Sequence, residues 1–125
     1  MARTVVETDK APKSPAYSQA VKAGGLIFVS GQPPFDPVTG KVVGTTIQEQ
    51  TAQSLRNIQA ILEAAGSGLD KMVQATVILV EESDFAGMNE EWCRWFPKNP
   101  PARQGAKLPV RPPGVKISIA AIAEG

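Results

Sequence analysis

The segment Pro100–Gly105 carries the side chain best suited to bind a small anion. Arg103 follows two consecutive prolines, which stiffen the backbone before it, and Gly105 lets a ligand approach the main chain closely. A planar guanidinium held in this way can bind a carboxylate through two parallel hydrogen bonds. The alternative is a solvent-facing arginine on a strand edge, and composition alone leaves both interpretations open.

The chain contains no histidine, which limits what the other polar groups can do. Serine or cysteine nucleophiles with a histidine base are excluded, as are most catalytic zinc sites. Tyr17 is either a hydroxyl that orients a ligand or an amphipathic core residue. Ser30 and Gly31 end a predicted strand, where the chain either forms a pocket wall or turns. Asn89, on a predicted helix, faces either the same cleft or solvent.

Composition excludes several further classes of protein. The 13 Lys and Arg residues are interleaved with 12 Asp and Glu, for a net charge of +1, so a dedicated nucleic-acid binder is not expected. The single Cys93 allows no internal disulfide and no cysteine metal cluster, which fits a reducing compartment. Residues 1–10 hold no apolar run, and no segment reaches the roughly 20 apolar residues of a membrane span. We therefore expect a soluble, cytoplasmic protein without a metal site.

The elements that must position these residues follow from periodicity within one domain, residues 1–125. Gly24-Gly25 between two apolar runs predicts a hairpin. Thr46 and Glu49 form a capping box at the start of a helix that ends before Gly66. The predicted strands are Thr4–Val6 at an edge, Ala20–Ala23, Leu26–Ser30, Met72–Val80 as a central strand covered on both faces, and Val115–Ile122.

Both predicted helices have an apolar stripe. In the first helix, Ile47, Thr51, Leu55, Ile58 and Leu62 share one side, and Gln48, Gln53, Arg56 and Glu63 take the other. The second helix begins at Ser83 or Asp84 and runs to Phe96, where Pro97 stops it, with a stripe of Phe85, Met88, Trp92 and Trp95 or Phe96.

Two helices on one face of a mixed sheet make an α+β sandwich. The other face of such a sheet is left for an oligomeric partner or for solvent.

Seven short motifs, taken together and in this order, resemble the Rid family of reactive-intermediate deaminases, also called the YjgF-like or L-PSP family. The resemblance covers essentially the whole chain. The motifs are Ala11-Pro12 with Tyr17-Ser18-Gln19-Ala20, Phe28-Val29-Ser30-Gly31-Gln32, Gln53–Ile58, Glu63–Gly66, Asp84-Phe85 with Asn89, Pro101-Ala102-Arg103, and Val115–Ala123.

The resemblance implies a chorismate-mutase-like α+β fold assembled as a homotrimer, with a central β-barrel and three clefts between subunits. It also implies hydrolysis of 2-imino acids and enamines, such as 2-iminobutanoate, 2-iminopropanoate and 2-aminoacrylate, to 2-keto acids and ammonia without a cofactor.

The same resemblance implies a role for each candidate residue. Arg103 matches the clamp for the substrate carboxylate, and its main chain with that of Gly105 approaches the imine nitrogen or keto oxygen. Tyr17 and Ser30 match residues that contact substrate or water. Gly31 matches the pocket wall, and Asn89 matches a helix residue that lines the cleft.

The chain departs from the deaminating members at two positions. Gly105 stands where these members usually have a cysteine. Ser118 stands where they usually have a glutamate that activates water, and a serine can position water but cannot act as a general base near neutral pH. The first hypothesis is a hydrolase in which Arg103, Tyr17 and Ser118 act on the substrate.

The alternative is a non-catalytic or regulatory binder of small 2-keto acids in the same cleft. A third hypothesis, ribonuclease activity as attributed to some relatives, is disfavoured by the neutral charge and the absence of histidine.

Overall fold

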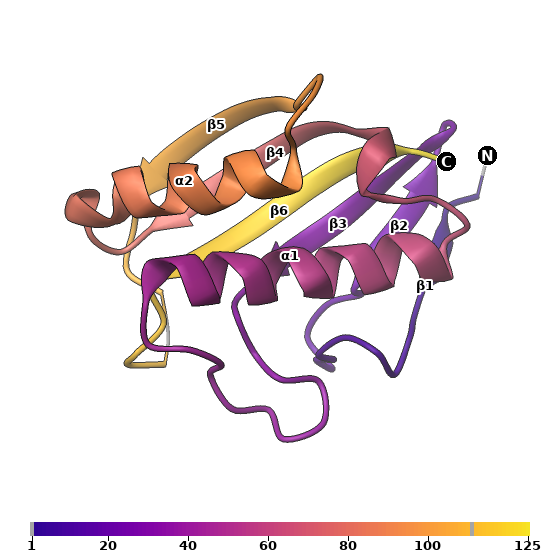
Figure 1. Ribbon diagram of the computed structural model, residues 1–125. Coiled ribbons are helices and arrows are strands. Elements are labelled where there is room, and N and C mark those ends of the chain that lie inside the picture. Colours follow the sequence, from indigo (N-terminus) through magenta and orange to yellow (C-terminus); the bar gives the residue numbers. More distant parts are fainter. Residues whose placement is uncertain (1, 111) are drawn as a thin grey trace.

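The computed structural model describes residues 2–110 and 112–125 of the chain. Within these residues, a mixed six-stranded sheet carries two α-helices on one face (Figure 1). The predicted α+β architecture with both helices on one face is therefore confirmed. The elements are β1 (Thr4–Val6), β2 (Ala20–Ala23), β3 (Leu26–Gln32), α1 (Ile47–Ala64), η1 (Leu69–Lys71), β4 (Met72–Leu79), η2 (Glu82–Asp84), α2 (Phe85–Trp95), β5 (Ala102–Lys107) and β6 (Ile117–Glu124).

The order of the strands separates β3, which carries Ser30 and Gly31, from β5, which carries Arg103. The sheet runs β1-β2-β3-β6-β4-β5, in which β4 and β5 pair in parallel and the other neighbours pair antiparallel. Gly24 and Gly25 have φ values of 60° and 79°, which a tight turn of this kind requires, so the predicted hairpin is confirmed. The parallel pair needs a crossover, and α2 supplies it.

Helix α1 begins and ends where the sequence predicts. The Glu49 N–H donates to Thr46 Oγ1 at 3.1 Å, and the Thr46 N–H donates to a Glu49 carboxylate oxygen at 3.1 Å, which completes the capping box. Gly66, just after the C-cap residue, has a φ of 81° and ends the helix in the left-handed conformation that favours glycine. Helix α2 begins after Asp84 and ends at Trp95, two residues before Pro97.

The core lies between the helices and the sheet. Leu55 and Ile58 of α1 pack against Ile27 of β3 and Ile119 of β6, and all four side chains are fully buried. Trp92 of α2 belongs to this core, whereas Trp95 and Phe96 pack against it half-buried. Burial of such side chains stabilises the fold by roughly 1.5–3 kcal/mol each.

Polar side chains of α1 satisfy the loops that surround it. Gln50 is buried and donates to the carbonyl oxygens of Gly44 and Gly114 at 3.1 and 2.8 Å, and it accepts from the Lys116 N–H at 2.8 Å. This one side chain therefore joins the loop before α1 to the loop that enters β6.

The sequence places Gln53 on the side of α1 opposite the apolar stripe, and the structure shows that this side is not open to solvent at Gln53. Gln53 is buried because the loop after β3 covers that side of the helix. The neighbouring Asn57 donates to the carbonyl oxygens of Pro33 and Phe35 at 3.2 and 3.0 Å, and Gln53 donates to Asn57 Oδ1 at 3.0 Å.

The sequence analysis missed one strand and was wrong about the cover of another. The proline-rich segment contains β5, which the predicted strands do not include. The strand at residues 72–79 is covered by helices on one face only, since the residues on its other face are half-buried. That helix-free face also exposes 42% of Phe28 and part of Ile122.

Candidate functional site

Arg103 lies on β5, at the edge of the sheet, and its side chain faces α2. Its Nη2 donates to Asn89 Oδ1 at 2.8 Å, and its Nη1 lies 3.8 Å from Met88 Sδ. The guanidinium carbon is 5.1 Å from the centroid of the Trp92 ring and 5.8 Å from that of Phe85. These contacts hold the cation in one direction, and most of its five N–H donors remain for a ligand.

The side-chain direction follows from the sheet register. Arg103, Gly105 and Lys107 pair with Ala75, Val77 and Leu79 of β4, so they share the face that the helices cover. Gly105, two residues after Arg103, therefore faces α2 as Arg103 does.

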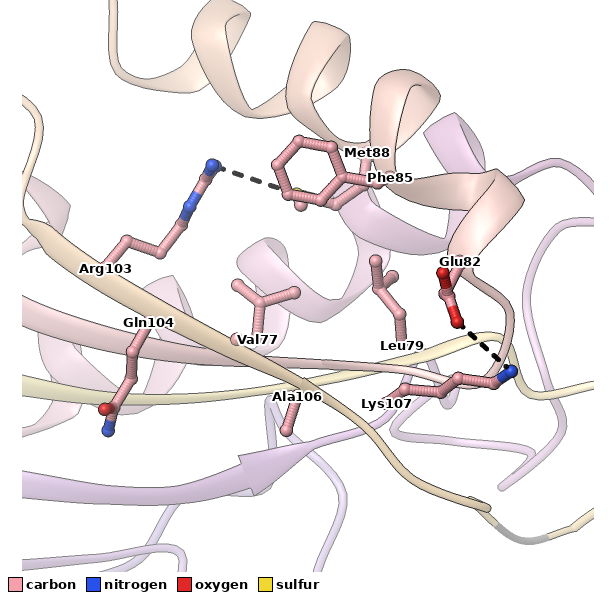
Figure 2. Close-up of a pocket in the computed structure, with 10 residues that line it drawn as sticks. Val77, Leu79, Glu82, Phe85, Met88, Arg103, Gln104, Ala106 and Lys107 are labelled. Atoms are coloured by element: carbon pink, nitrogen blue, oxygen red, sulfur yellow. Dashed lines mark hydrogen bonds and ion pairs between the residues drawn. The ribbon is translucent and has the colours of Figure 1, made fainter.

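A pocket of about 560 Å³ occupies that space, between α2 and the β4–β5 edge (Figure 2). Arg103 stands at one end, and an ion pair between Lys107 and Glu82 at 3.6 Å stands at the other. The residues that line it are Val77, Leu79, Glu82, Phe85, Met88, Arg103, Gln104, Gly105, Ala106 and Lys107.

A second group of predicted residues lies around the start of the hairpin. Ser30 Oγ donates to the Ser18 carbonyl at 2.6 Å, and the Ser30 N–H donates to the Gln19 carbonyl at 2.9 Å. These bonds place Tyr17 beside Ser30 on the wall of an open groove of about 630 Å³, with 54% of the tyrosine exposed. Tyr17 is therefore not a core residue.

Gly31 and Ser118 lie next to this second group. A Cβ added at Gly31 would lie 3.0 Å from Ser118 Oγ, so a side chain at position 31 would crowd the hydroxyl. Ser118 is nearly buried and pairs with Ile78 on the helix-free face of the sheet.

The structure thus gathers the predicted residues into two sets rather than one. The first set is Arg103, Gly105 and Asn89. The second set is Tyr17, Ser30, Gly31 and Ser118. Because β6 and β4 separate β3 from β5, Ser30 and Gly31 of β3 lie about 14 Å from β5 across the sheet, and Ser118 of β6 lies about 10 Å from it. A three- or four-carbon acid cannot touch both sets within one chain.

Sequence reasoning missed the pocket residues Phe85 and Met88, which it assigned to the core stripe of α2. The signal is the position of Phe85, which lies three residues before Met88 and four before Asn89 and so shares a side of the helix with each of them. Met88 is buried as predicted, whereas 53% of Phe85 is exposed at the mouth of the pocket.

In residues 2–110 and 112–125, no three His, Cys, Asp or Glu side chains lie close enough together to hold a metal ion. The described part of the chain also contains no helix of the length and hydropathy that crossing a membrane requires.

The fold is that of a single-sheet α+β protein with a pocket of small-molecule size beside Arg103. Residues 8–125 match the family model described as Endoribonuclease L-PSP. The chain belongs to this family, the Rid family, as the sequence motifs predict.

Three relatives illustrate the likeness. A RutC family protein of Pyrococcus abyssi is 47% identical over 124 residues, which are 98% of each chain. The 2-iminobutanoate/2-iminopropanoate deaminase of Rattus norvegicus is 41% identical over 97% of this chain and 89% of its own length. The structure of E. coli TdcF with bound serine is 34% identical, covers 98% of each chain and has a TM-score of 0.90.

Proposed function

We propose that this protein hydrolyses small 2-imino acids, and the enamines in equilibrium with them, to 2-keto acids and ammonia. The observation that carries the proposal is the Arg103 guanidinium, which Asn89 and two aromatic rings hold at the end of a largely apolar pocket. A cation in this setting suits a small carboxylate whose remainder is apolar. The relative from Rattus norvegicus named as a deaminase of such imino acids supports the same reaction.

In the proposed reaction the substrate carboxylate pairs with Arg103, and the imine carbon comes to lie beside the main chain of Gly105. A water molecule adds to that carbon, so a C–O bond forms and the C=N bond becomes a C–N bond. One proton of the water passes to the nitrogen. The new hydroxyl then loses its proton to the nitrogen, the C=O bond forms, and ammonia leaves with the C–N bond electrons.

The remaining residues contribute position rather than proton transfer. Tyr17 and Ser30 contact the substrate or its water, Gly31 forms the wall, and the Ser118 hydroxyl orients the water. Because serine is no general base near neutral pH, the reaction relies on carboxylate anchoring and on the electrophilic imine carbon.

A homotrimer completes the site in this proposal. The two residue sets lie too far apart to act together in one chain, so the Arg103 set of one copy meets the Tyr17 set of the next. The helix-free sheet face supports the assembly, because Phe28, Ile78 and Ile122 leave apolar surface there without cover. In the trimer, these faces close into a central barrel.

A second candidate function is binding of small 2-keto acids without turnover, for regulation. The observation that favours it is that the pocket offers no unpaired carboxylate to act as a general base among the described residues. Glu82 is the one acidic side chain among the described residues that line the Arg103 pocket, and it is already paired with Lys107. Ser118 stands where a general base is needed.

The test generates 2-aminoacrylate from serine with a dehydratase and follows the release of pyruvate. We expect release faster than the spontaneous rate, and a loss of two or more orders of magnitude in Arg103→Ala. Release at the spontaneous rate would exclude the hydrolase. Thermal stabilisation by 2-oxobutyrate without any acceleration would support the binder instead.

Mixing two variants tests the shared site. Arg103→Ala retains the Tyr17 set, and Tyr17→Ala retains the Arg103 set. Unfolding and refolding the two together should give assemblies in which about a quarter of the sites combine both intact sets, with activity restored to match. Activity that stays absent in the mixture, while each variant alone assembles normally, would contradict a site shared between subunits.

A further inference from the structure

Within a single chain, before any neighbouring copy is added, the Arg103 pocket is much larger than a three-carbon acid requires. Its volume of about 560 Å³ lies within the range of roughly 300–1,000 Å³ that is typical of sites for drug-sized ligands. Resting on the proposed function, we propose that this chain prefers 2-imino acids with a bulky apolar side chain, aromatic or branched, which lies along β5 past Gly105.

Gly105 opens the floor of this subsite. It shares the face of Arg103 and lies two residues further along the strand, where a substrate side chain would pass. A Cβ added there would meet one atom among the described residues beyond its chain neighbours, the Val77 carbonyl oxygen at 3.1 Å. Its other directions are open, so any side chain at position 105 would project into the pocket.

The walls of the subsite are apolar. Val77 and Leu79 rise from β4, and Phe85 and Met88 descend from α2 on the opposite side (Figure 2). Phe85, with 53% of its surface exposed, has an unburied aromatic ring that a ligand side chain would cover. Val77, Leu79 and Met88 are already nearly buried, so Phe85 is the wall whose surface an apolar ligand group would remove from water.

The far end of the pocket favours an uncharged group over a second carboxylate. Lys107 is the cation that a dicarboxylate would need, but its ammonium lies 3.6 Å from the Glu82 carboxylate. The pair is largely exposed to solvent and neutral as a whole, so it offers an added anion little net attraction. The apolar stretch between Arg103 and this ion pair is therefore the part of the pocket that distinguishes one substrate side chain from another.

The experiment compares imino acids made in place by an amino-acid oxidase from phenylalanine, leucine and alanine. We expect kcat/KM for the phenylalanine or leucine product to exceed that for the alanine product by about tenfold or more. Gly105→Cys should lower this ratio by about tenfold, because its side chain occupies the subsite. Val38→Ala, which removes an exposed apolar side chain outside the pocket, should leave the ratio unchanged.

A second measurement separates this inference from the proposed reaction. Calorimetry measures the dissociation constants of phenylpyruvate and pyruvate, which bind without turnover. We expect phenylpyruvate to bind more tightly. If the alanine product is hydrolysed as fast as the bulky ones, the reaction stands and the subsite is overturned. If no imino acid is hydrolysed and phenylpyruvate still binds tighter in a manner that Gly105→Cys abolishes, the reaction fails and the subsite stands.

Discussion

Replacing Asn89 with aspartate tests whether Arg103 is free to bind a carboxylate. Asn89 Oδ1 accepts a hydrogen bond of 2.8 Å from Arg103 Nη2. Aspartate has nearly the same shape, but it would place a full negative charge at that distance. Arg103 would then be paired within its own chain, and a substrate carboxylate would have to compete with Asp at position 89.

The size of the effect follows from the burial of the pair. Hydrogen bonds to charged groups contribute about 1.5–3 kcal/mol, and the lower end applies here because Arg103 and Asn89 are only half-buried. A loss of about 1.5 kcal/mol corresponds to roughly a tenfold rise in KM for the imino acid. Asn89→Ala should instead keep KM within about threefold and lower kcat, since it frees the guanidinium but removes its support.

The assay measures kcat and KM separately, with calorimetry of a 2-keto acid as the binding measurement. Asn99→Asp adds the same charge on an exposed residue outside the pocket and is the matched control. If Asn89→Asp binds the keto acid as tightly as the unchanged protein does, the carboxylate does not bind at Arg103 and the proposed anchor is refuted.

Four further predictions address stability, catalysis and assembly. Gln50→Ala removes three hydrogen bonds and should lower the free energy of unfolding by about 3 kcal/mol in urea titration; a change under about 0.5 kcal/mol would contradict this. Ser118→Glu should raise kcat by about 100-fold and add an acidic limb to its pH profile; an unchanged profile would mean that position 118 does not reach the water. Phe28→Asp should yield a folded monomer without activity, as light scattering would report, and a variant that stays trimeric would contradict the proposed interface. Hydrogen bonds from the backbone hold the pKa of Glu49 below its ordinary value of 4.5. The stabilisation from the ionised carboxylate is therefore complete above that value and is lost as the pH falls through the lower folded-state pKa. Glu49→Gln should flatten the fall of the melting temperature at acid pH, and an unchanged slope would contradict this.

Much of the fold is predictable from the sequence because the core-facing pattern is regular. The apolar stripe of α1 and the turn residues Gly24-Gly25 each follow from local chemistry, and the structure confirms both. Strand β5 carries no such signal. Residues 102–107 lie at the sheet edge, and Arg103 is the one that is not fully exposed, so no apolar alternation marks the segment.

The polar interior of the protein was harder to predict. Gln50, Gln53 and Asn57 are buried because they satisfy carbonyl groups of loops that lie over α1. Their partners are distant in the sequence or belong to the backbone, so neither residue type nor helical periodicity distinguishes them from surface amides. The same limit applies to the site, where the proximity of Arg103 to Asn89 depends on how α2 crosses β5.

The edge position of β5 has a consequence for solubility. An edge strand offers a row of unpaired N–H and C=O groups to any other extended chain, and charged side chains are one means by which proteins discourage such pairing. Arg103 and Lys107 supply those charges at the two ends of a strand that prolines bracket. The side chain proposed to bind substrate therefore has a second effect, since its charge discourages another extended chain from pairing with this edge.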